Sequence, residues 1–267
     1  MPGGKQERLA SLRAEIRKLE GYDLAETRAR LRFGLPALDA LLPEGGLPLP
    51  ALHLVEPARL EWDDGLAAGF LAALLRQLME AAAPEPVRTG PLLWITRHAD
   101  LYGPGLLNFG LPPERLLLVQ ARSDKEVLWC LEEGLRDGAP ALLLGELGGF
   151  DQVAARRLQL AAEAAGRPGF LLLRPFHAPR PAVPGGAASH WRIAPAPGGA
   201  LGRGEERLPG PPAWRVELLR CRGGRPGAFV LEWENATGRF VMAAPFCDRV
   251  PAADEGTGLA LRALGAG

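Results

Sequence analysis

The chain has 267 residues, of which 47% are hydrophobic, and its formal net charge at pH 7 is zero. This length suits one large domain or two small ones with a core of ordinary size. No run approaches the ~20 apolar residues of a membrane-spanning helix, and the N-terminus lacks an apolar leader, so we expect a cytoplasmic protein without membrane contact. The cysteines lack CxxC spacing, which argues against a disulfide framework or a zinc site.

Residues 5–20 predict an amphipathic helix that ends at Gly21. Its apolar residues recur at steps of three and four and therefore share one face: Leu9, Leu12, Ile16 and Leu19. A helix this short is not stable alone in water. We expect the stripe to bind a partner protein or a second copy, or else to join the core of its own chain. We assign residues 1–32 to this helix and a linker.

Apolar segments alternate with helical patterns through the middle of the chain. We expect strands near 51–56, 92–96, 116–119, 141–145 and 170–174, and helices near 65–82, 103–109, 124–137 and 151–166. Strands this apolar, separated by helices, predict an α/β fold whose mostly parallel, twisted sheet is covered by helices on both faces.

The C-terminal part changes character. A strand near 190–194 precedes a Pro/Gly-rich segment at 195–212 that we expect to be flexible. Strands near 214–221 and 228–233, joined by Arg-Gly-Gly-Arg-Pro-Gly, predict an antiparallel β-hairpin, and a short strand follows at 239–242. We assign residues 33–245 to one core domain and 246–267 to a flexible tail.

Positive charge is concentrated in one part of the sequence. Residues 156–225 hold 12 arginines against four acidic residues, a net charge of +8 that the remainder of the chain balances. A clustered positive field is typical of a site for polyanions. Lysine occurs at only three positions, so a GC-rich genome is an alternative explanation for the many arginines.

Several motifs, in their order along the chain, resemble the core of RecA-type recombinases. They are Phe-Gly-Leu-Pro-Ala-Leu-Asp at 33–39, Glu-Gly-Gly-Leu-Pro at 44–48, Leu-His-Leu-Val-Glu-Pro at 52–57, the stretch 97–110 and the stretch 185–191. Within that superfamily, the N-terminal helix, the missing phosphate-binding motif and the segment 214–226 are similar to the ImuA family. The resemblance implies a RecA-like fold.

The segment where a RecA-like nucleotide loop would lie is degenerate. Such a loop reads GxxxxGK[ST], because backbone N–H groups, a lysine and a hydroxyl must hold the phosphates and magnesium. Residues 57–65 contain no Lys, Ser or Thr and three carboxylates, which would repel a triphosphate. The positions concerned are Pro57, Arg59, Asp63, Asp64 and Gly65.

Two other positions also indicate that the residues for nucleotide hydrolysis are missing. The strand that should end in a magnesium-binding Asp ends in Gly145 and Glu146, and His98 lies where the resemblance places a catalytic glutamate. We therefore predict no ATPase activity, no cofactor and no metal. The alternative is a divergent ATPase that uses Arg59 and Glu146. The four histidines also lack the spacing of metal ligands.

The resemblance implies a non-catalytic adaptor in SOS-type translesion synthesis, or damage-induced mutagenesis. It implies contacts with an ImuB-like protein, RecA and an error-prone DnaE-type polymerase. A different function, a cell-division inhibitor of the SulA type, also occurs on RecA-like folds without Walker motifs and stays open.

The resemblance also indicates where weak, non-specific DNA binding would occur. The loop after the fifth core strand and the hairpin supply side chains that could neutralise phosphates or stack on bases: Arg174, Phe176, His177, Arg180, Arg220 and Arg222. The loop is alternatively a solvated Pro-rich connection. The hairpin arginines alternatively face solvent, an acidic partner or the acidic loop of a neighbouring copy.

The tryptophans are expected mostly in the core. Those in predicted strands and helices should serve packing: Trp94, Trp129, Trp191, Trp214 and Trp233. Trp62 lies in the degenerate loop and could fill the space that a nucleotide would have occupied.

Overall fold

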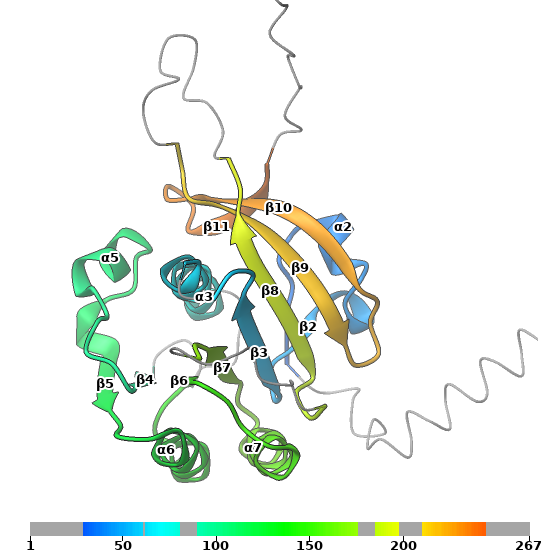
Figure 1. Ribbon diagram of the computed structural model, residues 1–267. Helices are drawn as coiled ribbons and strands as arrows, with labels where there is room; N and C mark the ends of the chain where they lie inside the picture. Colours follow the sequence, from blue (N-terminus) through cyan, green and yellow to red (C-terminus); the bar gives the residue numbers. More distant parts are fainter. Residues whose placement is uncertain (1–28, 61, 81–89, 176–184, 198–209, 244–267) are drawn as a thin grey trace, which may run out of the picture.

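The computed structural model of the chain describes residues 29–60, 62–80, 90–175, 185–197 and 210–243 (Figure 1). A nine-stranded sheet organises these residues, in the order β11-β10-β9-β8-β3-β7-β6-β4-β5. The predicted N-terminal helix, with Leu9, Leu12, Ile16 and Leu19, and the predicted tail lie outside the described residues. So do Phe176, His177 and Arg180.

Six neighbouring strands of the sheet run parallel. They are β3 (Leu52–Pro57), β4 (Leu92–Thr96), β5 (Leu116–Gln120), β6 (Leu142–Leu147), β7 (Gly169–Leu173) and β8 (Ser189–Pro195). An antiparallel extension follows, with β9 (Ala213–Cys221), β10 (Gly227–Glu234) and β11 (Arg239–Met242). The α/β fold class, the mostly parallel sheet and the C-terminal hairpin are therefore confirmed.

Helices cover both faces of the sheet (Figure 1). On one face α3 (Asp64–Glu80) packs on β3 and β8, and α5 (Gly103–Asn108) lies on the same side. On the other face α6 (Asp124–Asp137) packs on β6 and β4, and α7 (Gln152–Ala165) packs on β3 and β7. Within the described ranges, no helix combines the length and apolarity that crossing a membrane requires.

Local sequence sets the ends of α6 and α7. The side chains of Ser123 and Asp151 accept hydrogen bonds from backbone N–H groups in the first turns. At the C-terminal ends, Gly138 and Gly166 adopt the left-handed conformation, which glycine reaches without strain. These caps explain why the two helices match their predicted ranges closely.

The N-terminal part of the described chain adds small elements, and the carbonyls of Ala40 and Leu41 accept hydrogen bonds from Arg225 in the turn between β9 and β10. The strands β1 (Arg30–Leu31) and β2 (Leu47–Pro48) pair with each other, and the short helices are α2 (Pro36–Asp39), η2 (Pro43–Gly45) and, later in the chain, η3 (Pro113–Arg115). The Asp39 carboxylate accepts hydrogen bonds from the N–H groups of Phe33 and Gly34, which fixes the turn before α2.

The core on the α3 face is rich in aromatic rings. Phe240 contacts Phe70, Trp214 and Trp233 with ring centroids 5.3 to 5.8 Å apart, and Trp214 donates a hydrogen bond to the Leu66 carbonyl. These two tryptophans, together with Trp94 and Trp191, are buried as predicted. The prediction was wrong for Trp129, which is 60% exposed.

The core on the α6 and α7 face is aliphatic and depends on close helix packing. A Cβ atom on Gly145 of β6 would lie 2.5 Å from Leu131 Cδ1, and one on Gly134 of α6 would lie 2.7 Å from Leu143 Cδ2. Both distances are too short for real contacts. A glycine at position 145 within β6 therefore has a packing reason, because it lets α6 approach the sheet.

Candidate functional site at the carboxyl edge of the sheet

The carboxyl ends of parallel strands form the edge at which α/β proteins of this kind bind ligands. Here this edge collects the loop between β3 and α3, the end of β6, and the residues that follow β4 and β7. The chain places charged side chains in all of these segments, and they contact one another.

In the loop after β3, an internal carboxylate binds the only basic residue. Buried Asp63 accepts hydrogen bonds from the Arg59 backbone N–H at 2.9 Å and from its Nη2 and Nε atoms at 2.9 and 3.2 Å. The side-chain hydrogen bond from Arg59 lowers the pKa of Asp63 below its ordinary value. Arg59 is therefore already paired with the Asp63 carboxylate of its own loop.

Glu146, at the end of β6, is buried and fully partnered. Its Oε1 atom accepts a hydrogen bond from Trp94 Nε1 at 2.5 Å. Its Oε2 atom pairs with Arg174 and lies 3.3 Å from Thr96 Oγ1, whose one hydroxyl hydrogen also has the His98 carbonyl within reach at 2.9 Å. A buried carboxylate held by an indole and a guanidinium has little remaining capacity for a metal ion.

Arg174, directly after β7, is the centre of the cluster. Its Nη2 atom lies 2.7 Å from Asp100 Oδ2, its Nε atom lies 3.5 Å from Asp64 Oδ2, and its Nη1 atom pairs with Glu146. The side chain is only 11% exposed. Burial alone would lower the pKa of Arg174, but its hydrogen bonds and its attraction to Asp100 and Glu146 outweigh burial and raise that pKa.

A second internal anion lies next to this cluster. Asp124 accepts hydrogen bonds from the N–H groups of Gly148 and Gly149, at 3.1 and 3.2 Å, and from Arg97 Nη1 at 2.9 Å. Paired backbone N–H groups after a strand are a common anion-binding arrangement. Here the chain supplies its own carboxylate to them.

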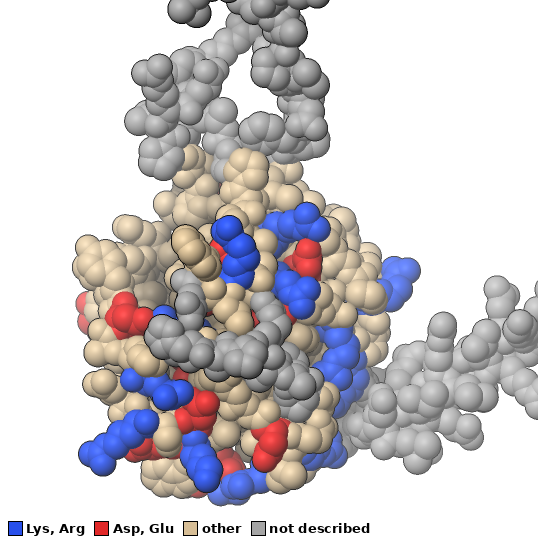
Figure 2. Space-filling model, in the orientation of Figure 1, with Lys and Arg blue, Asp and Glu red and all other residues tan. Residues whose placement is uncertain are grey.

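The predicted hairpin arginines lie away from this cluster, beside the start of β8. Arg220 Nη2 donates to the Ala187 carbonyl at 3.2 Å, and Arg222 Nη2 donates to the Gly186 carbonyl at 3.5 Å. Arg222 also lies 3.6 Å from Glu163 of α7, whereas exposed Arg220 pairs with no carboxylate that the structure describes. In Figure 2, basic side chains gather where Figure 1 shows β8, β9 and α7.

Comparison with known proteins decides the family. No family model matches the chain. Protein ImuA from each of two strains of Caulobacter vibrioides is 43% identical to it over 213 residues, which cover 77% of this chain and 84% of the relative. The chain belongs to the ImuA family. The family resemblance that the sequence motifs indicated is thereby confirmed.

The structure of this ImuA-family chain revises two predicted roles. Arg174 was expected to contact DNA, but its guanidinium is enclosed by three carboxylates and supports an internal role instead. Trp62 does not fill a nucleotide space, because its side chain is 82% exposed. Among the residues described, no group of three or more His, Cys, Asp or Glu is arranged to hold a metal ion.

The sequence did not predict three residues of the cluster around Arg174, namely Trp94, Thr96 and Asp100. Trp94 and Thr96 lie in β4, and Asp100 lies in the segment that follows it. Polar residues that end or follow a core strand are the signal that could have pointed to Thr96 and Asp100. Trp94 gave no such signal, since a strand tryptophan is more simply a packing residue.

Proposed function

We propose that this ImuA-family protein is a non-catalytic adaptor in damage-induced translesion synthesis. One observation carries the proposal beyond family membership. At the edge where a RecA-like protein would bind nucleotide, the one guanidinium of Arg174 is held by three carboxylates, so this cluster keeps an excess of negative charge. Arg59 and Glu146, the residues of the rival ATPase hypothesis, each have internal partners. That the described residues which the ATPase hypothesis needs already have internal partners supports a non-catalytic role.

The proposed partners follow from the resemblance. They are an ImuB-like protein, RecA and an error-prone DnaE-type polymerase. We propose that the apolar stripe of residues 5–20 contributes to one of these contacts or to self-association, because four apolar side chains on one helical face need a surface to cover them.

The adaptor proposal predicts that the protein does not bind ATP. Calorimetric titration with magnesium and ATP should give no saturable heat up to millimolar ATP, and phosphate release should equal that of buffer, with a RecA-type ATPase as the positive control. The physical reason is that Asp63 and Asp64 would face the triphosphate while the nearby arginines are already paired. Saturable binding that disappears in Arg59→Ala or Glu146→Gln would support the rival ATPase.

The DNA contact that we propose is the surface formed by the β9–β10 hairpin and the start of β8. The end of the loop after β7 and the β9–β10 hairpin, which the sequence separately associated with DNA, meet there through the hydrogen bonds of Arg220 and Arg222. Arg220 is exposed, and its hydrogen bond to the Ala187 carbonyl uses one of the five N–H groups of its guanidinium. No helix that could read bases is involved, so binding should be weak and independent of sequence.

The expected signature of this contact is a steep dependence on salt. Each phosphate neutralised on single-stranded DNA contributes about −0.7 to the slope of log K against log salt. The double variant Arg220→Ala/Arg222→Ala should therefore have a slope shallower by about 1.4, measured by fluorescence anisotropy with a labelled oligonucleotide. Arg59→Ala, which removes an exposed arginine elsewhere, is the matched control and should keep the slope. An unchanged slope in the double variant, or no binding by the wild type at low salt, would assign the arginines to protein contacts.

A further inference from the structure

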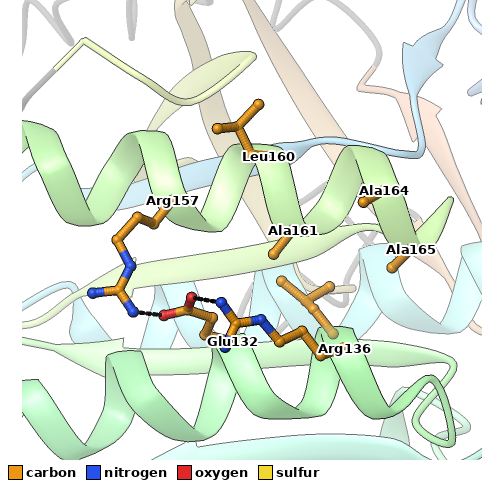
Figure 3. Close-up of a pocket in the computed structure, with 8 residues that line it drawn as sticks. Glu132, Arg136, Arg157, Leu160, Ala161, Ala164 and Ala165 are labelled. Carbon is orange, nitrogen blue, oxygen red and sulfur yellow. Dashed lines mark hydrogen bonds and ion pairs between the residues drawn. The ribbon is translucent and has the colours of Figure 1, made fainter.

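A groove runs between α6 and α7 on the outer side of the helix layer. It consists of two hollows of about 460 and 340 Å³. The larger is lined mainly by the C-terminal halves of the helices and the smaller by their N-terminal halves. Both hollows share Glu132 and Arg157 (Figure 3), so together they extend along most of the helix pair.

The walls of the groove carry several large apolar side chains that are exposed to solvent. Trp129, Val153 and Leu160 line it and are all exposed. Other apolar side chains complete the lining: Leu128, Leu135, Ala154, Leu158, Ala161, Ala164 and Ala165. Contiguous exposed apolar side chains of this kind mark protein interaction sites, and tryptophan and arginine are enriched among the residues that dominate binding.

The groove has a buried carboxylate at its base and exposed basic side chains at its rim. Figure 3 shows Arg136 of α6 and Arg157 of α7 reaching one carboxylate, that of Glu132. That carboxylate belongs to a side chain that is 7% exposed, whereas both arginine side chains are 60% exposed. Lys125 also lines the groove and forms no ion pair with a described residue. An approaching molecule therefore meets cations first.

Of the remaining carboxylates of the two helices and their caps, Asp151 alone lines the groove. The groove lining therefore holds Lys125, Arg136 and Arg157 against Glu132 and Asp151, a net charge of +1, and Glu132 is the buried member of this set. The solvent-facing rim thus favours an acidic occupant.

The charge also argues against the chain's own N-terminal segment as the occupant. Residues 5–20 contain five basic and three acidic residues, a net charge of +2, so the segment has the same sign as the rim whether it comes from the same chain or from a second copy. A groove between two helices with apolar walls is the usual seat of an amphipathic helix.

We propose that the α6–α7 groove binds an amphipathic helix of a partner protein, whose apolar face contacts Trp129, Val153 and Leu160 and whose flanking carboxylates pair with Lys125, Arg136 and Arg157. The proposal deepens the adaptor function and rests on it only in taking the occupant to be another protein. It makes no use of nucleotide or DNA, so its test is independent of the titrations above.

The test uses the full chain and two labelled helical peptides of about 18 residues with the same leucine stripe. One peptide carries glutamate at the positions that flank the stripe, and the other carries lysine there. Fluorescence anisotropy should show saturable binding of the acidic peptide and affinity lower by roughly tenfold or more for the basic one. The Trp129→Ala variant should weaken binding of the acidic peptide by roughly tenfold or more, and Lys125→Glu should weaken it too.

Two further variants make the result specific to the groove. Tyr102→Ala removes an exposed aromatic side chain before α5, away from the groove, and should leave affinity unchanged. Val153→Ser changes a second exposed wall residue and replaces Trp129→Ala should that variant fail to fold. The proposal is overturned by an acidic peptide that does not bind, by equal affinity for both peptides, or by unchanged affinity in the wall variants.

Discussion

Arg174→Ala is expected to lower the free energy of unfolding by about 3–5 kcal/mol, because it leaves a buried charge without its partner. Glu146 would keep Trp94 and Thr96 as hydrogen-bond donors but would lose its only cation among the described residues. Its carboxylate is buried, so water cannot replace the lost guanidinium at low cost. Urea unfolding followed by tryptophan fluorescence measures the change.

The double variant Arg174→Ala/Glu146→Gln separates this cause from lost packing. Removing the orphaned charge should restore a substantial part of the stability lost in Arg174→Ala, since replacing both members of a buried pair costs much less than removing one. Arg136→Ala, which removes an exposed arginine from a pair on α6, is the matched control and should cost about 1 kcal/mol or less. A loss of similar size in all three variants would refute the role given to Arg174.

The stability of the protein should also fall by about 3 kcal/mol on acidification through the range in which His53 titrates. Burial lowers the pKa of His53 from 6.5 to about 4, and the hydrogen bond to the Pro48 carbonyl only partly opposes this. The ring nitrogens contact Ser189 Oγ at 2.7 Å and the Pro48 carbonyl at 2.8 Å, deep in the sheet. The folded protein therefore keeps His53 neutral.

The direction of the change in stability with pH follows from proton binding. Between pH 6.5 and about 4 the unfolded chain binds a proton at His53 that the folded protein does not, so the free energy of unfolding decreases as pH falls and levels off below about 4. The lowered pKa values of Asp63 and Asp100 act in a more acidic range, because their stabilisation is lost only as those carboxylates protonate. Urea unfolding at several pH values should show a flatter dependence for His53→Gln than for the wild type between pH 6.5 and 4. Identical dependence in both proteins would contradict the assignment.

Much of the fold could be predicted because short-range patterns encode it. The apolar strands and the caps of α6 and α7 are local features, and both agree with the structure. Trp129 shows a pattern that was available but misinterpreted. Val127, Leu131 and Leu135 step by four along α6 and are buried, and Trp129 lies two residues from this stripe, which turns it by about 200° to the opposite side. Its exposure follows from that spacing.

The pairings at the carboxyl edge could not be predicted in this way. Periodicity indicates which face of an element is buried, but it does not say which charged groups meet after the chain has folded. Arg174 was assigned to DNA because it opens a basic loop, whereas its partners lie 28 to 110 residues earlier in the sequence. The exposure of the apolar strand β5 could not be predicted either. Only the strand order shows that β5 lies at the end of the sheet, where Leu117 and Leu118 are exposed.

The sequence separations within the Arg174 cluster have a consequence for folding kinetics. Arg174 lies 110 residues from Asp64, 74 from Asp100 and 28 from Glu146, so its contacts require the strands between them to be already in place. Contacts that close such long loops form after most of the chain entropy has been lost. We therefore expect the cluster to be absent from the folding transition state. Interactions formed that late slow unfolding and leave the folding rate nearly unchanged, so the cluster sets how long the native state persists once it has formed.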